Sequence, residues 1–182
     1  MAPVRERSVP ELATSAASLH GPSEYPFPLN WAPGSYDERV SALATSVWRQ
    51  RALFTPDQWD LALTVRLDGV LAGVQGARAT DFPTLRTAEI YSWLAPAYQG
   101  DDVGTLMRQA MCAFLFDDLG AVAVTTGVFE DNPLAATRAR QVGFAPNGSS
   151  VRLRGDSVMP HMSYVLVAET LVRPASPVHG PV

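Results

Sequence analysis

The sequence has 182 residues, of which 47% are hydrophobic and 18% charged, and its formal net charge is −4. Such values are typical of one globular domain with a sizeable core, and a net negative charge gives no electrostatic basis for binding nucleic acid. All 14 basic residues are arginine, which excludes a lysine Schiff base and the lysine of a P-loop. Because no apolar run is long enough to span a bilayer and no secretory leader is recognisable, we expect a cytoplasmic protein without a membrane partner.

Two helices are expected near the amino terminus. Residues 1–7 leave little room for an opening strand. The first helix is expected over residues 8–19, because Ser8 can cap it and a proline suits its first turn. The second begins at a capping box, in which Ser35 precedes Glu38 by three residues, and it is expected to reach about Arg51.

An aromatic segment lies between these helices. Residues 25–31 contain too much proline for a helix or a central strand. We expect an extended loop, and Phe27 and Trp31 are candidate substrate-binding residues in the wall of an acceptor pocket. The alternative is a loop whose rings only cover the core.

The centre of the chain predicts three antiparallel strands. Asp68 and Gly69 separate two apolar runs, residues 61–67 and 70–76, which is the pattern of a hairpin with a two-residue turn. Residues 86–94 form the next expected strand. A helical pattern then starts near Val103, where apolar residues recur at steps of three and four.

The remaining elements are a strand buried on both faces, a helix and a closing pair of strands, expected over residues 121–128, 134–142, 151–154 and 163–168. Gly155 and Pro160 are expected to join the closing pair. We expect one domain over residues 1–173 and a disordered tail over residues 174–182.

Two kinds of reactive site receive no support from the sequence. Cys112 lies on the apolar side of a predicted helix, so we expect a small buried hydrophobe rather than a nucleophile. No cluster of histidine, cysteine and carboxylate residues has the spacing of metal ligands, so no metal is expected.

The turn between the strand at 86–94 and the helix at Val103 is suited to phosphate. A glycine-bearing turn at a helix N-terminus points backbone N–H groups and a positive dipole end at one place. Asp101 and Asp102 oppose this role, because each carboxylate repels an anion. Their alternative role is to cap the helix and complement its dipole.

This turn and a later segment resemble the GNAT acetyltransferase superfamily. Gln99, Gly100 and Gly104 match its acyl-CoA loop, Q/R-x-x-G-x-G/A, and Asp131-Asn132-Pro133 followed by Gly143-Phe144 matches its second motif. The likeness is greatest to the branch that acetylates protein N-termini and small-molecule amines. The resemblance implies an α/β (α+β) fold with a mixed twisted sheet of about six or seven strands, splayed in the middle and flanked by about four helices.

The resemblance also implies a site for acetyl-CoA as co-substrate. Its pantetheine arm would lie along the backbone of Trp93, Leu94 and Ala95, and Asn132 would reach the pantetheine or the thioester end. Its pyrophosphate would face the residues of the turn, namely Gln99, Gly100, Val103, Gly104 and Thr105. The sequence departs from the family pattern where Asp102 replaces the middle glycine and where Ala135 replaces a serine.

Transfer of acetyl to an amine needs a base, N–H donors for the thioester oxygen and an acid for the leaving thiolate. Glu89 is a candidate base if it faces the cleft; the alternative is an outward-facing residue at the strand rim. Tyr91 is a candidate acid and pocket residue, or else a packing residue, and it shares a strand face with Glu89 and Trp93. His161, placed before the closing strands, is a weaker candidate for substrate binding.

Three functions stay open on the sequence. The first is an acetyl-CoA-dependent N-acetyltransferase for a small-molecule amine or a peptide N-terminus, with a homodimer as an open option. The second is a repurposed enzyme of the same fold that uses another donor or no CoA, motivated by Asp101, Asp102 and Ala135. The third is a non-catalytic binding module.

Overall fold

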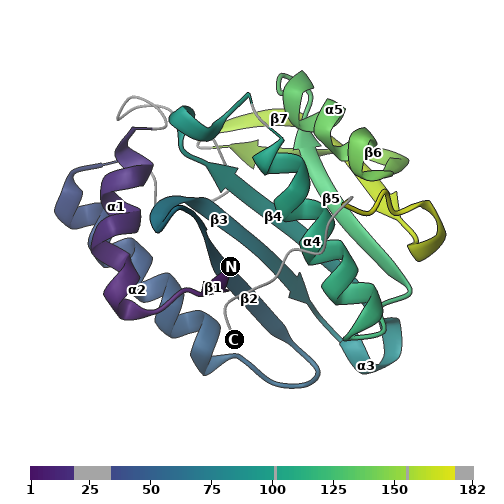
Figure 1. The fold of residues 1–182 in the computed structure, drawn as a ribbon, viewed down its shortest axis with the longest axis horizontal. Coiled ribbons are helices and arrows are strands. Elements are labelled where there is room, and N and C mark those ends of the chain that lie inside the picture. Colours follow the sequence, from purple (N-terminus) through teal and green to yellow (C-terminus); the bar gives the residue numbers. More distant parts are fainter. Residues whose placement is uncertain (19–33, 101, 155, 175–182) are drawn as a thin grey trace.

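The computed structural model describes residues 1–18, 34–100, 102–154 and 156–174, and these residues form a sheet flanked by helices (Figure 1). Among them, seven strands follow the spatial order β1-β2-β3-β4-β5-β7-β6. The strands are β1 (Ala2–Pro3), β2 (Trp59–Leu67), β3 (Val70–Ala79), β4 (Thr87–Leu94), β5 (Ala123–Phe129), β6 (Ala145–Arg154) and β7 (Ser157–Leu166). The helices are α1 (Val9–Ala17), α2 (Tyr36–Ala52), α3 (Phe82–Leu85), α4 (Val103–Asp117) and α5 (Pro133–Val142). The predicted fold class and mixed sheet are therefore confirmed.

The β2–β3 hairpin forms as its turn residues predict. Leu67 pairs with Val70, which leaves Asp68 and Gly69 as a two-residue turn. Both have positive φ, 49° and 81° respectively. This backbone matches the twist of the flanking strands, and glycine adopts it without strain.

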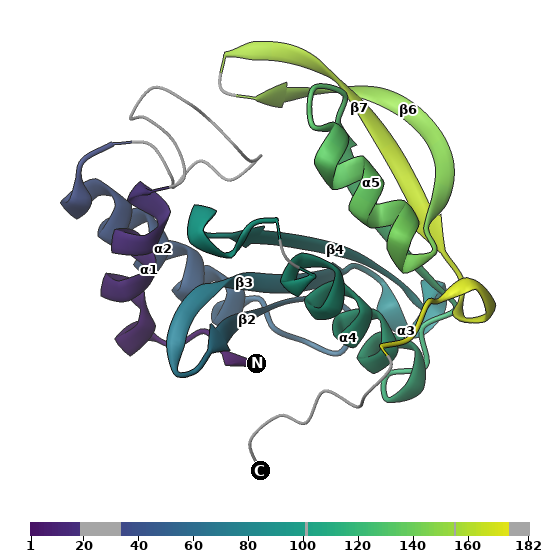
Figure 2. The ribbon, with the colours of Figure 1, turned by 45° about the horizontal axis from the view of Figure 1, so that its top comes forward.

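Helices cover the two faces of the sheet at different places. On one face, α1 and α2 pack over β3 and the end of β4, where Leu12, Leu43 and Trp93 are buried together. On the other face, Met111 and Leu115 of α4 pack against the centre of the sheet. Figure 2 shows α1 and α2 stacked at the β1–β3 end, away from α4 and α5. The alternation of β4 produces this division, because neighbouring side chains point to opposite faces.

The two central parallel strands part midway. β4 and β5 pair at only three positions, from Thr87 and Ala123 to Glu89 and Thr125. The next link is a side-chain bond, in which Thr126 Oγ1 donates to the Ile90 carbonyl at 3.2 Å. Beyond this point α5 and the β6–β7 hairpin diverge from β4 (Figure 2). The predicted splay of the sheet is thus present.

The first and last elements differ from the prediction in extent. The opening strand is indeed reduced to two residues, and α1 begins at Val9 without a side-chain bond from Ser8. The closing strands are ten residues each, so Pro160 lies inside β7 opposite Val151 and does not join the strands. Its carbonyl accepts a bond from the Glu130 N–H at 3.1 Å, so the prolyl nitrogen faces the end of β5 and breaks no β6–β7 bond.

The strand predicted to be buried on both faces is only partly buried. Val124 and Val128 of β5 are buried under α4 and α5, and Phe129 is buried on the opposite face, whereas residues 125–127 are half-buried. The reason is that α1 and α2 lie over β3 and β4 and leave the opposite face of β5 partly open. Of the predicted tail, residues 174–182, all but Pro174 lie outside the described residues.

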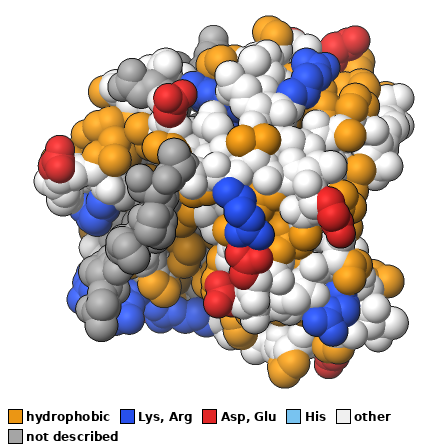
Figure 3. Space-filling model, turned by 45° about the vertical axis from the view of Figure 1, so that its right-hand side comes forward, with side chains coloured by type: hydrophobic (Ala, Val, Ile, Leu, Met, Phe, Trp, Pro, Cys, Tyr) orange, Lys and Arg blue, Asp and Glu red, His pale blue; other side chains and the backbone are white. Residues whose placement is uncertain are grey.

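The surface carries both signs of charge. Basic, acidic and apolar side chains are interspersed on the face shown in Figure 3. Exposed ion pairs such as Arg173–Asp117 and Arg154–Asp131 join separate elements. Within the described ranges, no helix has the length and hydropathy that crossing a membrane requires.

Candidate active site

The parting of β4 and β5 leaves backbone groups directed into the gap between them. The Ala95 N–H donates to the Ala72 carbonyl of β3 at 2.8 Å, and the Trp93 carbonyl lies against Gly73 of the same strand. Because N–H and C=O groups alternate in direction along a strand, Leu94 then faces the gap. The Ala95 N–H and the Trp93 carbonyl therefore point toward β3, whereas the Ala95 carbonyl accepts a bond from the Tyr98 N–H at 2.9 Å. The role of these residues toward a pantetheine arm stays a prediction.

The turn after β4 is held to the strand end by a side chain. Gln99 Nε2 donates to the Leu94 carbonyl at 2.8 Å, so Gln99 anchors the turn. Gly100 has a φ of 105°, a conformation that side chains rarely adopt, which explains glycine at this position. Asp102 precedes the helix, but its exposed side chain makes no capping bond. Asp101 lies outside the described residues.

Helix α4 approaches α5 closely at its first turn. A Cβ on Gly104 would lie 3.3 Å from Nη1 of Arg138, so the glycine lets this guanidinium rest against the helix start. Thr105 Oγ1 donates to Gln141 Oε1 of α5 at 3.4 Å. Val103 and Gly104 begin α4 as predicted. The turn and the beginning of α4 are therefore lined by a basic side chain from α5.

A second arginine lies one helical turn further along α4. Nη1 of Arg108 is buried and has no hydrogen-bond partner among the described residues. Burial, and next the charge of Arg138, lower the pKa of Arg108 to about 10. The guanidinium of Arg138 lies against the start of α4, and its charge acts on Arg108, so the two positive charges lie near each other. Two like charges without a carboxylate partner in the described part of the chain favour an anion.

Asn132 caps the start of α5 through its own side chain. Its Oδ1 accepts a bond from the Ala135 N–H at 3.0 Å, which makes it the N-cap of α5. Pro133 follows in the first turn, where its missing N–H leaves no bond unmade. The side-chain oxygen predicted to reach a thioester is therefore already engaged, and Ala135 packs partly against the core.

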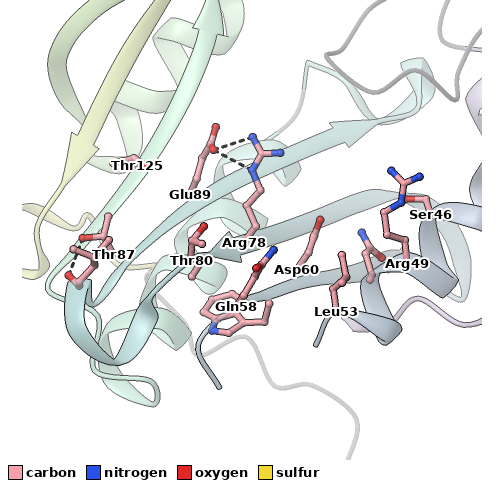
Figure 4. Close-up of a pocket in the computed structure, with 14 residues that line it drawn as sticks. Ser46, Arg49, Leu53, Gln58, Asp60, Arg78, Thr80, Thr87, Glu89 and Thr125 are labelled. Atoms are coloured by element: carbon pink, nitrogen blue, oxygen red, sulfur yellow. Dashed lines mark hydrogen bonds and ion pairs between the residues drawn. The ribbon is translucent and has the colours of Figure 1, made fainter. Parts of the chain in front are cut away.

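The opposite side of the sheet holds a cavity of about 490 Å³ between α2 and strands β2 to β5 (Figure 4). A smaller cavity of about 70 Å³ adjoins it and extends toward Trp93 and Leu12. Charged residues of both signs line the larger cavity, namely Arg49, Asp60, Arg78 and Glu89. This cavity has the polar lining that a small amine substrate requires.

Glu89 faces this cavity, which favours the first of its two predicted orientations. Nε and Nη2 of Arg78 both donate to Glu89 Oε2, at 3.0 and 2.8 Å (Figure 4). The pair is partly exposed, since its side chains keep 43% and 31% of their accessible surface. Glu89 thus presents a carboxylate that is oriented and partly neutralised.

Tyr91 is a buried hydrogen-bonding residue. Its hydroxyl donates to Asp60 Oδ1 at 2.5 Å and accepts from Gln50 Nε2 at 3.4 Å. The ring lies over Gly76, where a Cβ would come within 2.1 Å of Cζ. Burial, and next the charge of Asp60, raise the pKa of Tyr91 above its ordinary value. These contacts argue against the predicted acid role, because the proton is held by Asp60.

His161 lies within β7 rather than before the closing strands, and it is 6% exposed. Its ring packs edge-on to Phe129 with centroids 5.2 Å apart. Burial and the charge of Arg152 lower the pKa of His161, and Glu89 opposes this shift. Among predicted substrate residues, Phe27 and Trp31 fall outside the described part of the chain.

The sequence reasoning did not single out Asp60, Arg78, Arg108 or Arg138. A signal existed for the first two, since each is a charged residue within a mainly apolar strand. Cys112 is buried, and burial raises the pKa of its thiol to about 12, as expected of a packing residue. No cluster of three or more histidine, cysteine or carboxylate residues suited to a metal occurs within the described ranges.

Comparison with known proteins places this geometry in context. A family model described as an acetyltransferase (GNAT) domain matches residues 2–145. The structure of Mycobacterium smegmatis RimJ in complex with CoA-disulfide is similar, with a TM-score of 0.80 at 19% identity, covering 92% of this chain and 80% of that chain. RimL, a ribosomal L7/L12 alpha-N-protein acetyltransferase in complex with coenzyme A, reaches 0.73 at 17% identity and 93% of each chain. A spermidine N-acetyltransferase SpeG chimera from Vibrio cholerae and hSSAT reaches 0.68 at 16% identity, covering 91% of this chain and 92% of that chain.

Proposed function

This chain belongs to the GNAT acetyltransferase family, and from that premise we propose that it transfers an acetyl group from acetyl-CoA to a primary amine of a small molecule or a peptide N-terminus. The observation that carries the proposal is the parting of β4 and β5 after Glu89 and Thr125. The gap separates two unlike environments. One contains Arg108 and Arg138, for which the described residues supply no carboxylate partner, and the other contains the cavity with its two carboxylates.

The donor would occupy the side of α4 and α5. The Leu94 N–H faces the gap and can donate to a carbonyl of a pantetheine arm, as in an added strand, whereas the Leu94 carbonyl already accepts a bond from Gln99. Arg108 and Arg138 supply positive charge beside the first turn of α4, where the helix dipole also favours a phosphate. Asp102 opposes this charge only weakly, because its carboxylate is exposed and screened by solvent.

The acceptor would occupy the cavity beside α2. Asp60 and Glu89 attract an ammonium group, while Arg49 and Arg78 balance their charge. The cavity is therefore close to neutral, which favours an acceptor with one amine over a long polycation. Asn132 lies at the end of β5, where its side-chain NH₂ group can hold a thioester oxygen as it gains charge, while its Oδ1 caps α5.

Family membership and these two environments favour the transferase over the alternatives. A repurposed enzyme without CoA would not need the arginine pair beside α4. A binding module would not need a cavity that begins where the two strands part. The altered positions Asp102 and Ala135 are then adjustments within the family and do not replace its chemistry.

The experiment has two steps. Acetyl-CoA at 100 times its Kd should raise the melting temperature by about 5 to 10 °C. Release of free thiol should then be measured with spermidine and with a peptide of the L7/L12 amino terminus as acceptors. Stabilisation by acetyl-CoA, together with release of its free thiol in the presence of either acceptor, supports the proposal. No stabilisation by millimolar acetyl-CoA would overturn it.

A further inference from the structure

His161 reaches the point where β4 and β5 part, although it belongs to a different strand. In the ladder between β5 and β7, Phe129 pairs with His161 and Gly127 with Ser163. Glu89 pairs with Thr125 across the parallel ladder. Paired residues share a face and alternate residues along a strand do too, so His161 lies on the same face as Glu89. That face is the one that holds the cavity.

The absence of a side chain at Gly127 allows the imidazole to lie across β5. A Cβ at this position would come within 2.0 Å of His161 Cε1 and 2.4 Å of Nε2. Gly127 follows Thr126, whose hydroxyl makes the last link to β4 before the gap. The ring therefore rests on the backbone of β5 directly beside the opening.

The surroundings of the His161 ring favour its neutral form. Its Nδ1 is buried and has no hydrogen-bond partner among the described residues. Burial and the charge of Arg152 from β6 lower the pKa of His161, while the charge of Glu89 from β4 raises it. Arg154, which lies 4.9 Å over the Phe129 ring, is paired with Asp131. A neutral imidazole with an unused nitrogen is a proton acceptor.

The other titratable groups near the gap are less suited to this task. Glu89 receives two bonds from Arg78, and the Tyr91 proton is held by Asp60. Cys112 lies on the other side of the sheet, in the core under α4. We propose that His161 is the proton acceptor of the reaction, with Glu89 attracting the acceptor ammonium to it; this inference rests on the proposed function.

The proposed step balances as follows. His161 takes one proton from the acceptor ammonium, and the free amine nitrogen attacks the thioester carbon. The nitrogen–carbon bond forms, the carbon–sulfur bond breaks, and the second nitrogen proton goes to the departing thiolate. The products are the amide, the free thiol and one proton, which His161 returns to solvent.

The experiment compares four variants in the thiol-release assay with saturating acetyl-CoA. His161→Asn should lower kcat/KM for the acceptor by about 10²- to 10⁴-fold, the usual contribution of a general base. Gly127→Ala should lower it similarly, because the new Cβ displaces the ring without removing it. Ser163→Ala, on the same strand and face, is the matched control and should change kcat/KM by less than about threefold. In His161→Ala, added imidazole should restore part of the rate.

The pH profile separates catalysis from packing. In the wild type, kcat/KM should rise with pH, with an apparent pKa below the ordinary value of histidine. In His161→Asn this rise should be lost, while the Kd for acetyl-CoA stays unchanged. Unchanged turnover in His161→Asn, or no rescue by imidazole in folded His161→Ala, overturns the inference and leaves the proposed function standing. A wild type that is not stabilised by acetyl-CoA overturns the proposed function itself.

Discussion

The charged side chains on the two faces of the sheet differ in whether they are paired. On the face of α4 and α5, Arg108 and Arg138 lie close together with no carboxylate partner among the described residues, and Nη1 of Arg108 is buried. On the face of α2, the carboxylates are paired within the protein, Glu89 with Arg78 and Asp60 with Tyr91. Unpaired buried charge is unfavourable unless a ligand compensates it. The face of α4 and α5 is therefore suited to an anion, and the face of α2 is suited to an acceptor of low net charge.

The strongest test of this contrast is Arg138→Glu. The change places a carboxylate against Gly104 and beside Arg108. Loss of one charged hydrogen bond should raise the KM for acetyl-CoA by about 10- to 100-fold. Arg140→Glu is the control on the same helix, because Arg140 lies over the Tyr164 ring instead. An equal rise in both variants would mean that only the net charge of α5 matters.

Tyr91→Phe tests the pairing on the acceptor face. Removing the hydroxyl leaves Asp60 without its donor and should lower the free energy of unfolding by about 1.5 to 3 kcal/mol. Tyr36→Phe, at an exposed tyrosine, is the control and should have little effect. Urea denaturation at pH 7 measures both. A change in Tyr91→Phe no larger than the control would contradict a structural role for this bond.

The same tyrosine predicts a dependence on alkaline pH. Because the pKa of Tyr91 is raised in the folded state, its stabilisation is complete below the ordinary value of 10.0 and is lost as the pH rises above it. The unfolding free energy of the wild type should fall above pH 10, and that of Tyr91→Phe should fall less steeply. Parallel curves from pH 9 to pH 11 would contradict this assignment.

A smaller effect is expected at the start of α4. Asp102→Gly removes an exposed carboxylate that makes no capping bond, so stability should change by only a few tenths of a kcal/mol. The KM for acetyl-CoA should fall about two- to fivefold as repulsion of the phosphates is relieved. An unchanged KM would indicate that the arginine pair already neutralises this position.

The smallest effect concerns Arg78→Gln. Its ion pair with Glu89 is partly exposed, so the free energy of unfolding should change by less than about 1 kcal/mol. Thermal unfolding measures this, with Arg173→Gln, which breaks the exposed pair with Asp117, as the reference. A loss well above that of the reference would show that the pair stabilises the sheet as well as orienting Glu89.

Much of the fold was predictable because its signals are local. The turn at Asp68 and Gly69, the capping box of Ser35 with Glu38 and the periodicity of α4 each depend on residues within a few positions. The closing strands were predicted too short because β6 is exposed along nearly its whole length and shows no clean alternation. Pro160 was predicted to join the two closing strands, although it lies inside β7. A proline is acceptable there because its nitrogen faces the end of β5, where it interrupts no bond to β6.

The candidate site was predictable in outline and not in detail. The glycine at position 100 and the start of α4 beside Gly104 agree with the sequence analysis, whereas the orientation of Glu89 stayed open there and is given by the cavity. The backbone directions at Trp93 and Ala95 could not be predicted, because the direction of a backbone N–H depends on the register of β4 against β3, which the sequence does not display. Tyr91 stayed open between an acid and a packing residue because its partner, Asp60, lies 31 residues away in the sequence.

By itself, the sequence determined the local elements, the glycine turn and the family resemblance, because these depend on short-range sterics and hydrogen bonding. Only the tertiary structure decided where the two parallel strands part, which arginines are left unpaired and which histidine crosses Gly127. Those outcomes depend on register and burial, which arise when distant segments pack together and exclude water.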